Sequence, residues 1–215
     1  MLLTTTFLIF FVRFCDCCMP TKNGGMPILN EDLDEPEEVI STSQSPEEPT
    51  TTTTTEASED PKCPDDTWIL FNRGTYSWCM KTAIASIQQA EAAETCQNLN
   101  ANAVPSGFQN AAEVTTMIAQ ARAANNGEDA RFYIGAERVE NCIGKGITAS
   151  CTKLNSFKWT DGKTTGTDGW IWEGIQPNNW QFQQNYVYLD TEMGGLADGN
   201  GLFEYPGVIC GVEAS

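Results

Sequence analysis

Residues 157–185, near the C-terminal end, carry the side chains best suited to holding a ligand. This segment combines Trp170, Trp172 and Trp180 with a run of side-chain amides around one proline. Amide oxygens can coordinate a cation or accept hydrogen bonds, and indole rings offer flat apolar faces with a polar edge. Long loops are usually functional or disordered, and the tryptophan content argues against disorder. The composition is therefore typical of a binding loop.

A structural role is the alternative for the same side chains. The amides of residues 176–178 could simply satisfy backbone groups in an ordinary proline turn. Core packing is the favoured interpretation for Trp159, Trp170 and Trp172, because large aromatic side chains are mostly buried. Trp180 lies among polar residues, so it is the tryptophan best placed for ligand contact.

The rest of the sequence offers little for catalysis. It contains no histidine, which removes the usual general base and every Ser-His or Cys-His nucleophile pair. The carboxylate pairs Asp65-Asp66 and Glu128-Asp129 could do acid–base work in principle. Both pairs lie at segment starts or turns, where solvated carboxylates are common. We therefore expect a protein that is not an enzyme.

The charge of the chain limits the classes of partner that it can bind. The formal net charge is −17, which argues against nucleic acid and against an anionic membrane surface. Residues 1–62 carry three basic and twelve acidic residues, whereas residues 63–215 carry nine and seventeen. The N-terminal part is thus the more acidic per residue, and the remainder is only mildly anionic.

The N-terminal third divides into a leader and a polar segment. The apolar run from Leu2 to Val12 is too short to span a bilayer and has the length of a signal-peptide core, so we expect a signal peptide over residues 1–17. Residues 18–62 include an acidic block and an unbroken threonine run, and they are predicted to form a disordered stalk. O-glycosylation of such a stalk is an expectation of composition, and a plain flexible linker is the alternative.

The cysteines indicate an oxidising compartment. Nine cysteines are many for a cytosolic protein. A zinc site is the alternative, but the closely spaced Cys15, Cys17 and Cys18 lie beside the apolar leader, and no histidine is available for a mixed site. We therefore expect disulfides and secretion.

Local patterns beyond residue 63 predict an α+β domain. Apolar runs at residues 68–71 and 75–79, separated by a glycine turn, indicate a hairpin. Capping patterns that begin at Ser86 and at Asn110 predict two helices. The later part of the chain, beginning with residues 132–136, favours short strands.

These pieces, in this order, resemble the C-type lectin-like domain over residues 63–215. The resemblance implies an α+β fold of two helices, two small antiparallel sheets and a long loop region, braced by disulfides. The matching pieces are Cys63 with Cys79, Glu94-Thr95-Cys96, Phe132-Tyr133-Ile134-Gly135-Ala136, Phe157-Lys158-Trp159-Thr160-Asp161-Gly162, Gln176-Pro177-Asn178 and Val208-Ile209-Cys210.

The resemblance also selects a disulfide pattern, whereas spacing alone leaves fifteen pairings for six cysteines. It implies Cys63–Cys79 and Cys96–Cys210, and Cys142–Cys151 remains as a local extra bridge. A further disulfide that braces the long loop in the family has no counterpart here, because Tyr186 and about Gly201 stand at its positions. We therefore expect a long loop that is held less firmly than in relatives.

The calcium ligands that the resemblance implies are incomplete. The corresponding positions are Gln176, Asn178, Gln184, Ala197 and Asp198, which include a single carboxylate and one alanine. Calcium affinity rises with the number of carboxylates among its oxygen ligands. Nearby carboxylates that could be recruited are Glu173, Asp190 and Glu192.

Two functions follow from these observations. The preferred hypothesis is a secreted, extracellular recognition protein, as in innate defence, that binds a carbohydrate or a protein through the loop face without depending on calcium. The alternative is a calcium-dependent carbohydrate-binding lectin that holds the ion with Gln176, Asn178 and Asp198. The expected ligand-binding residues are Gln176, Pro177, Asn178, Trp180, Gln184 and Asp198.

Overall fold

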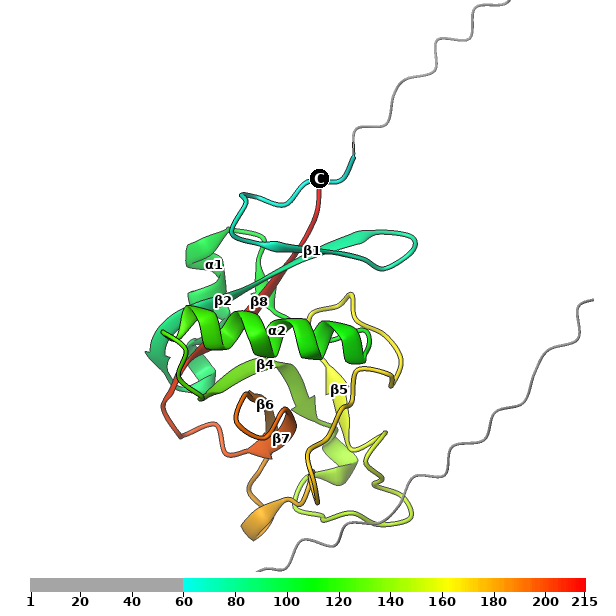
Figure 1. The fold of residues 1–215 in the computed structure, drawn as a ribbon. Helices are drawn as coiled ribbons and strands as arrows, with labels where there is room; N and C mark the ends of the chain where they lie inside the picture. Colours follow the sequence, from blue (N-terminus) through cyan, green and yellow to red (C-terminus); the bar gives the residue numbers. More distant parts are fainter. Residues whose placement is uncertain (1–59) are drawn as a thin grey trace, which may run out of the picture. The chain divides into compact units, whose positions relative to one another are not determined.

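Residues 60–215 are described by the computed structural model of the protein (Figure 1). The expected signal peptide, residues 1–17, and all but the last three residues of the expected stalk, residues 18–62, lie outside this range.

A hairpin and the C-terminal strand form one side of the sheet. Strands β1 (Ile69–Asn72), β2 (Ser77–Ile87) and β8 (Tyr205–Glu213) lie side by side and are antiparallel. The backbones of Lys62 and Ser215 exchange two hydrogen bonds, so the two ends of the domain meet. The antiparallel pairing of β1 with β2 confirms the predicted hairpin.

The other strands extend this sheet. They are β3 (Val104–Pro105), β4 (Arg131–Arg138), β5 (Phe157–Trp159), β6 (Tyr186–Asp190) and β7 (Gly195–Gly199). The main order is β1-β2-β8-β4-β6-β7, with β3 on β8 and β5 on β4. Tyr133 of β4 pairs in parallel with Val208 of β8. This pairing joins the two expected small sheets into one eight-stranded sheet.

Two α-helices pack against the strands. The second, α2 (Ala111–Ala124), begins as predicted, because the Asn110 side chain accepts a hydrogen bond from the Glu113 N–H. The prediction that the first helix begins at Ser86 is wrong. Ser86 and Ile87 belong to β2, since Ile87 pairs with Tyr205 of β8. The capping box lies two residues later, at Gln88 and Glu91. It opens a 3-10 turn, η1 (Gln89–Glu91), that leads into α1 (Ala92–Leu99).

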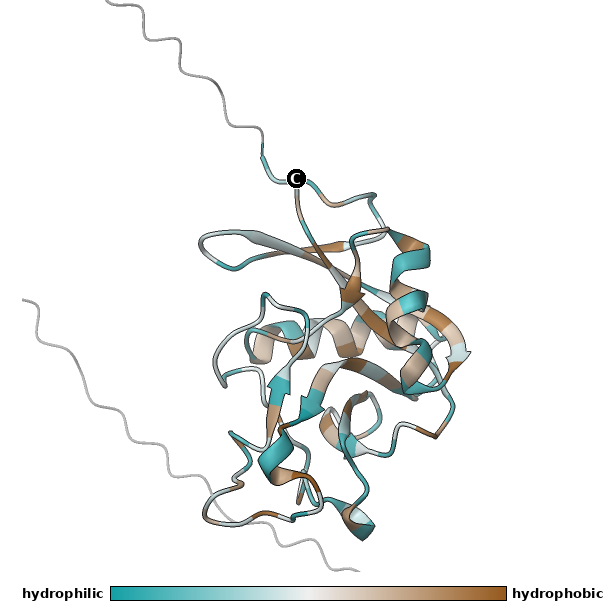
Figure 2. Cartoon of the chain, turned by 180° about the vertical axis from the view of Figure 1, so that it is seen from behind, coloured by the Kyte–Doolittle hydropathy of each residue, from teal (hydrophilic) through white to brown (hydrophobic). Residues whose placement is uncertain are grey.

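Apolar packing and disulfides hold these elements together. In Figure 2 the central strands carry long hydrophobic stretches. Disulfides join Cys63 to Cys79, Cys96 to Cys210 and Cys142 to Cys151, the same pairs that the resemblance implies. The Cys96–Cys210 bridge ties α1 to β8. Within residues 60–215 no helix has the length and apolar character needed to cross a membrane.

Stacked tryptophans support the base of the long loop, which we define as residues 160–185. The rings of Trp159 and Trp170 are parallel with centroids 3.5 Å apart, and the Trp170 and Trp172 rings are parallel at 5.4 Å. Trp170 is buried and the other two are partly buried. These three side chains therefore pack in or against the core, which is the interpretation that the sequence favoured.

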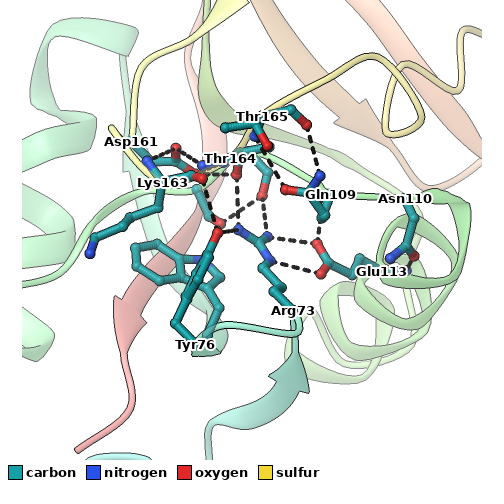
Figure 3. A network of polar contacts seen from close by, with 12 residues as sticks. Arg73, Tyr76, Gln109, Asn110, Glu113, Asp161, Lys163, Thr164 and Thr165 are labelled. Atoms are coloured by element: carbon teal, nitrogen blue, oxygen red, sulfur yellow. Dashed lines mark hydrogen bonds and ion pairs between the residues drawn. The ribbon is translucent and has the colours of Figure 1, made fainter.

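A buried polar network fastens the β1–β2 turn to α2 (Figure 3). The Arg73 guanidinium donates two hydrogen bonds to the Glu113 carboxylate, at 2.8 and 2.6 Å. It also donates to Thr164 Oγ1 at 3.0 Å and to the Tyr76 hydroxyl at 3.4 Å. Thr164 in turn donates to Asp161. One arginine thus joins the hairpin, α2 and the turn that opens the long loop.

Candidate functional site

Asp198, on β7, is fully buried, and protein donors contact both of its carboxylate oxygens. Oδ1 accepts a hydrogen bond from the Asn178 N–H at 2.9 Å. Oδ2 accepts one from the Asn179 N–H at 2.8 Å and one from Arg138 Nη2 at 2.6 Å. The Arg138 side chain is 1% exposed and that of Asp198 is 0% exposed. The cation that Asp198 contacts is therefore a guanidinium of the same chain.

Arg138 reaches this position from the end of β4. Its backbone N–H donates to the Asn185 carbonyl at 2.8 Å, and its Nε donates to the Gln184 carbonyl at 2.8 Å. The guanidinium lies over the Phe157 ring, 4.3 Å from its centroid. Arg138 thus fastens the end of the long loop to β4 as well as neutralising Asp198.

Two polar atoms beside this pair are buried and lack a partner among the described residues. They are Nη1 of Arg138 and Oδ1 of Asn185. The Arg138 N–H donates to the Asn185 carbonyl, so the two residues are neighbours where the long loop enters β6. This end of the loop therefore contains one buried donor and one buried acceptor without a hydrogen bond among the described residues.

The amides that the sequence singled out hold the loop itself. Gln176 Oε1 accepts from the Asn178 N–H at 3.1 Å, and Asn178 Oδ1 accepts from the Trp180 N–H at 2.9 Å. Gln184 Oε1 also accepts from the Trp180 N–H, while Gln184 Nε2 donates to the Asp198 carbonyl at 2.9 Å. The structure therefore brings all of these residues together around Asp198. Pro177, between the first two of them, is buried.

Burial dominates the electrostatics of the ion pair. It raises the pKa of Asp198 above its usual value, against the hydrogen bonds from Asn178 and Asn179 and the attraction of Arg138. Burial also lowers the pKa of Arg138, and the attraction of Asp198 does not fully offset it. The pair is therefore neutral as a unit but costly to bury.

The nearby carboxylates form a separate group. Asp190 pairs with Gly195 and Asp198 pairs with Val187, so the two aspartates lie at opposite ends of the β6–β7 hairpin. Asp190 accepts a hydrogen bond from Arg131 Nε at 2.9 Å. Burial, and then the charge of Asp190, raises the pKa of Glu173. These carboxylates thus surround Arg131 rather than Arg138.

The residues at Asp198 do not fit a calcium ion. Calcium requires several oxygen ligands and favours carboxylates among them. Here a single carboxylate is bonded to three protein donors, the amide oxygens accept backbone hydrogens, and position 197 is a buried alanine. Within residues 60–215 no group of three or more His, Cys, Asp or Glu residues is arranged to hold a metal.

Sequence reasoning missed Arg138, although the strand pattern contains a signal. Both faces of β4 are buried; Phe132, Ile134 and Ala136 alternate on the face that packs into the larger apolar cluster, and Arg138 continues that phase. A charge in phase with a buried face requires a partner. The partner, Asp198, lies 60 positions further along the chain.

An unusual backbone turn presents two aromatic side chains at the tip of the long loop. Asn179, Gln181 and Phe182 have φ values of 48°, 56° and 59°, a region that disfavours residues other than glycine. Trp180 and Phe182, within this turn, are 62% and 63% exposed. The turn therefore holds apolar rings in solvent at a conformational cost.

An aromatic contact stands where the resemblance places the missing disulfide. A Cβ atom added to Gly201 would lie 2.6 Å from the Tyr186 ring, so the ring packs directly on the glycine backbone. The two positions are thus neighbours, joined by packing instead of a covalent bond.

Comparisons with known proteins agree with this fold. A family model described as C-type lectin domain-containing protein 141/158 matches residues 69–193. A comparison with curated proteins gave no match.

Three solved structures share the fold at low sequence identity. The C-type lectin CEL-I from Cucumaria echinata has a TM-score of 0.53 and 19% identity, covering 70% of this chain and 96% of its own. The cow C-type carbohydrate-recognition domain of CD23 has a TM-score of 0.53 and 18% identity, covering 73% and 99%. Human lithostathine has a TM-score of 0.52 and 16% identity, covering 70% and 99%.

Proposed function

The chain belongs to the C-type lectin domain family, and from this premise we propose that it is a non-catalytic recognition protein that binds an extracellular glycan or protein without calcium. The disulfides of the domain favour an oxidising compartment. We propose secretion by a signal peptide over residues 1–17, with residues 18–62 as a stalk. A role in innate defence is the use that family membership favours.

The Arg138–Asp198 ion pair is the observation that carries the proposal. Calcium in such a loop would neutralise carboxylates and hold the backbone in a fixed shape. The Arg138 guanidinium neutralises the one carboxylate, and Asp198 fixes the loop through the N–H groups of Asn178 and Asn179. Both roles of an ion are therefore filled by side chains.

Ligand contact then falls to the outer surface of the loop. The amides of Gln176, Asn178 and Gln184 are engaged in internal hydrogen bonds. Trp180 is exposed and offers an apolar face with an indole edge. We propose that Gln176, Asn178, Gln184 and Asp198 shape the site and that Trp180 contacts the ligand.

Thermal unfolding of the full chain in calcium and in a chelator tests the proposal, with magnesium as the matched ionic control. The melting temperature should be the same in all three solutions. The alternative, a calcium-dependent lectin, requires Arg138 to release Asp198 to an ion. At a dissociation constant of about 1 mM, about 10 mM calcium would stabilise the fold by about 1.4 kcal/mol. A calcium-specific rise of about 3–6 °C would therefore overturn the proposal.

A further inference from the structure

A groove with aromatic walls runs beside the exposed turn of the long loop. Its volume is about 320 Å³, and Trp180, Tyr188, Phe203 and Tyr205 line it together with Arg131 and Glu204. Small-ligand sites begin at about this size. The groove therefore suits one or two rings of a small ligand.

The walls and the floor of the groove differ in exposure. Trp180 and Phe203 are 62% and 56% exposed, so their rings are free to contact a ligand. Tyr188 is buried and packs edge-on against Tyr205, with ring centroids 5.2 Å apart. A Cβ atom added to Gly199 would lie 2.7 Å from the Tyr188 ring, so this glycine leaves the space that the tyrosine fills. The groove thus combines two exposed aromatic side chains with a packed pair of tyrosines at its base.

We propose that this groove binds a neutral oligosaccharide, whose sugar rings stack on Trp180 and Phe203. The inference rests on the proposed function and assigns it a site and a ligand class. The apolar C–H faces of a pyranose ring match the faces of aromatic side chains. The hydroxyl groups at its edge find a donor in Arg131 and an acceptor in Glu204.

The charges around the groove select a neutral sugar over an anionic one. Asp190 already pairs with Arg131, whereas Glu192 and Glu204 are exposed. An adjoining depression shares Arg131 and Tyr205 with the groove and is lined by Asp129, Asp190 and Glu192. Sulfated or sialylated sugars would meet this negative field, so their binding is disfavoured.

The outer edge of β7 is already occupied at Leu196, which disfavours an extended peptide that adds a strand there. The Leu196 N–H of β7 donates to the Ile171 carbonyl at 2.8 Å, and the Leu196 carbonyl accepts from the Glu173 N–H at 3.0 Å. A peptide that adds a strand needs such backbone groups to be free. Recognition by ring stacking remains the better match to the groove.

Calorimetric titration of the full chain with cellotetraose and chitotetraose tests the proposal. Both are neutral, and their pyranose chairs carry equatorial substituents, so the axial C–H groups form apolar faces that can stack on aromatic rings. We expect at least one to bind in the presence of a chelator, and Trp180→Ala and Phe203→Ala each to weaken that binding by about tenfold or more. Phe182→Ala is the matched control, because Phe182 is equally exposed in the same turn but does not line the groove. Its affinity should stay at the wild-type value.

Other outcomes separate the groove from the proposed function. Binding that disappears in chelator would contradict calcium independence, whatever the groove variants do. Chelator-resistant binding that Trp180→Ala and Phe182→Ala weaken equally would overturn the groove while the proposed function stands. Binding that neither variant weakens would overturn both the groove and the ligand contact assigned to Trp180, and only calcium-independent recognition would stand. The groove proposal also fails if neither tetrasaccharide binds, or if a heparin tetrasaccharide or a lysine-rich peptide binds there instead.

Discussion

The side chains of two arginines, Arg73 and Arg138, are buried, and each is paired with a buried carboxylate in different surroundings. Every guanidinium nitrogen of Arg73 donates to an acceptor within the network of Figure 3. At Arg138, Nε and Nη2 have acceptors, but the buried Nη1 has none among the described residues. The first pair joins scaffold elements, whereas the second holds a loop.

The pKa values of the two arginines are shifted in opposite directions. Burial lowers the pKa of Arg73, but its hydrogen bonds to Glu113 and Tyr76 more than compensate, so the pKa is raised overall. Burial also lowers the pKa of Arg138, and there the attraction of Asp198 does not compensate. A fully satisfied pair fits a purely structural role. An incompletely satisfied pair below an exposed, unusual turn fits a loop kept in one shape for binding.

Removing the scaffold arginine should have the largest effect. Arg73→Met leaves the buried Glu113 carboxylate with the Gln109 N–H as a donor, and it also removes the bonds of the guanidinium to Tyr76, Thr164 and Gly107. We therefore expect the free energy of unfolding to fall by about 3–5 kcal/mol. Chemical denaturation measures this loss. The matched control is Lys158→Met, which breaks an exposed pair with Glu137 and should cost less than about 1 kcal/mol. Equal losses in the two variants would remove the scaffold role assigned to Arg73.

Removing the loop arginine should cost less. In Arg138→Met the Asp198 carboxylate keeps the N–H groups of Asn178 and Asn179 as donors. We therefore expect a loss of about 1–3 kcal/mol by the same denaturation experiment. A loss as large as that of Arg73→Met would mean that the two pairs do equivalent structural work, and the comparison would fail.

A pH titration of stability should give the smallest of these effects. Burial raises the pKa of Asp198 above its ordinary value of 3.8, so the folded protein binds this proton more tightly than the unfolded chain. The contribution of Asp198 to stability is therefore complete below pH 3.8 and is lost as the pH rises through the folded pKa.

The variant Asp198→Asn isolates this contribution, because asparagine does not titrate. Denaturation of both proteins at a series of pH values gives the difference in unfolding free energy, wild type minus variant. We expect that difference to decrease as the pH rises above 3.8. An increase would show that Arg138 controls the pKa of Asp198 more strongly than burial does.

The fold was predictable where local pattern and resemblance agreed. Asn110 caps α2 as its sequence indicates, and residues 132–136 lie in β4. The start of the first helix was not predictable in this way, because Ser86 has the right capping chemistry but Ile87 is drawn into the sheet by Tyr205. Local signals thus located the elements better than their ends.

The candidate site was predictable only in part. Gln176, Asn178, Gln184 and Asp198 do lie together, but their internal hydrogen bonds depend on how the loop folds back on β7. The ion pair joins residues on different strands, and an arginine at the end of a strand resembles a solvated surface charge. Tertiary contacts, rather than local pattern, therefore decided how Asp198 is neutralised.

Amide hydrogen exchange of residues 176–184 tests most directly whether Arg138, rather than calcium, holds this loop. The Asn178 and Asn179 amides donate to Asp198, so their protection reports the state of the carboxylate. In the full chain we predict equal protection in calcium and in chelator. In Arg138→Met we predict weaker protection of these amides, to the same extent in both solutions, because the bonds to Asp198 remain but the loop opens more often without the guanidinium. Protection that appears only in calcium, or that is unchanged in Arg138→Met, would contradict the account.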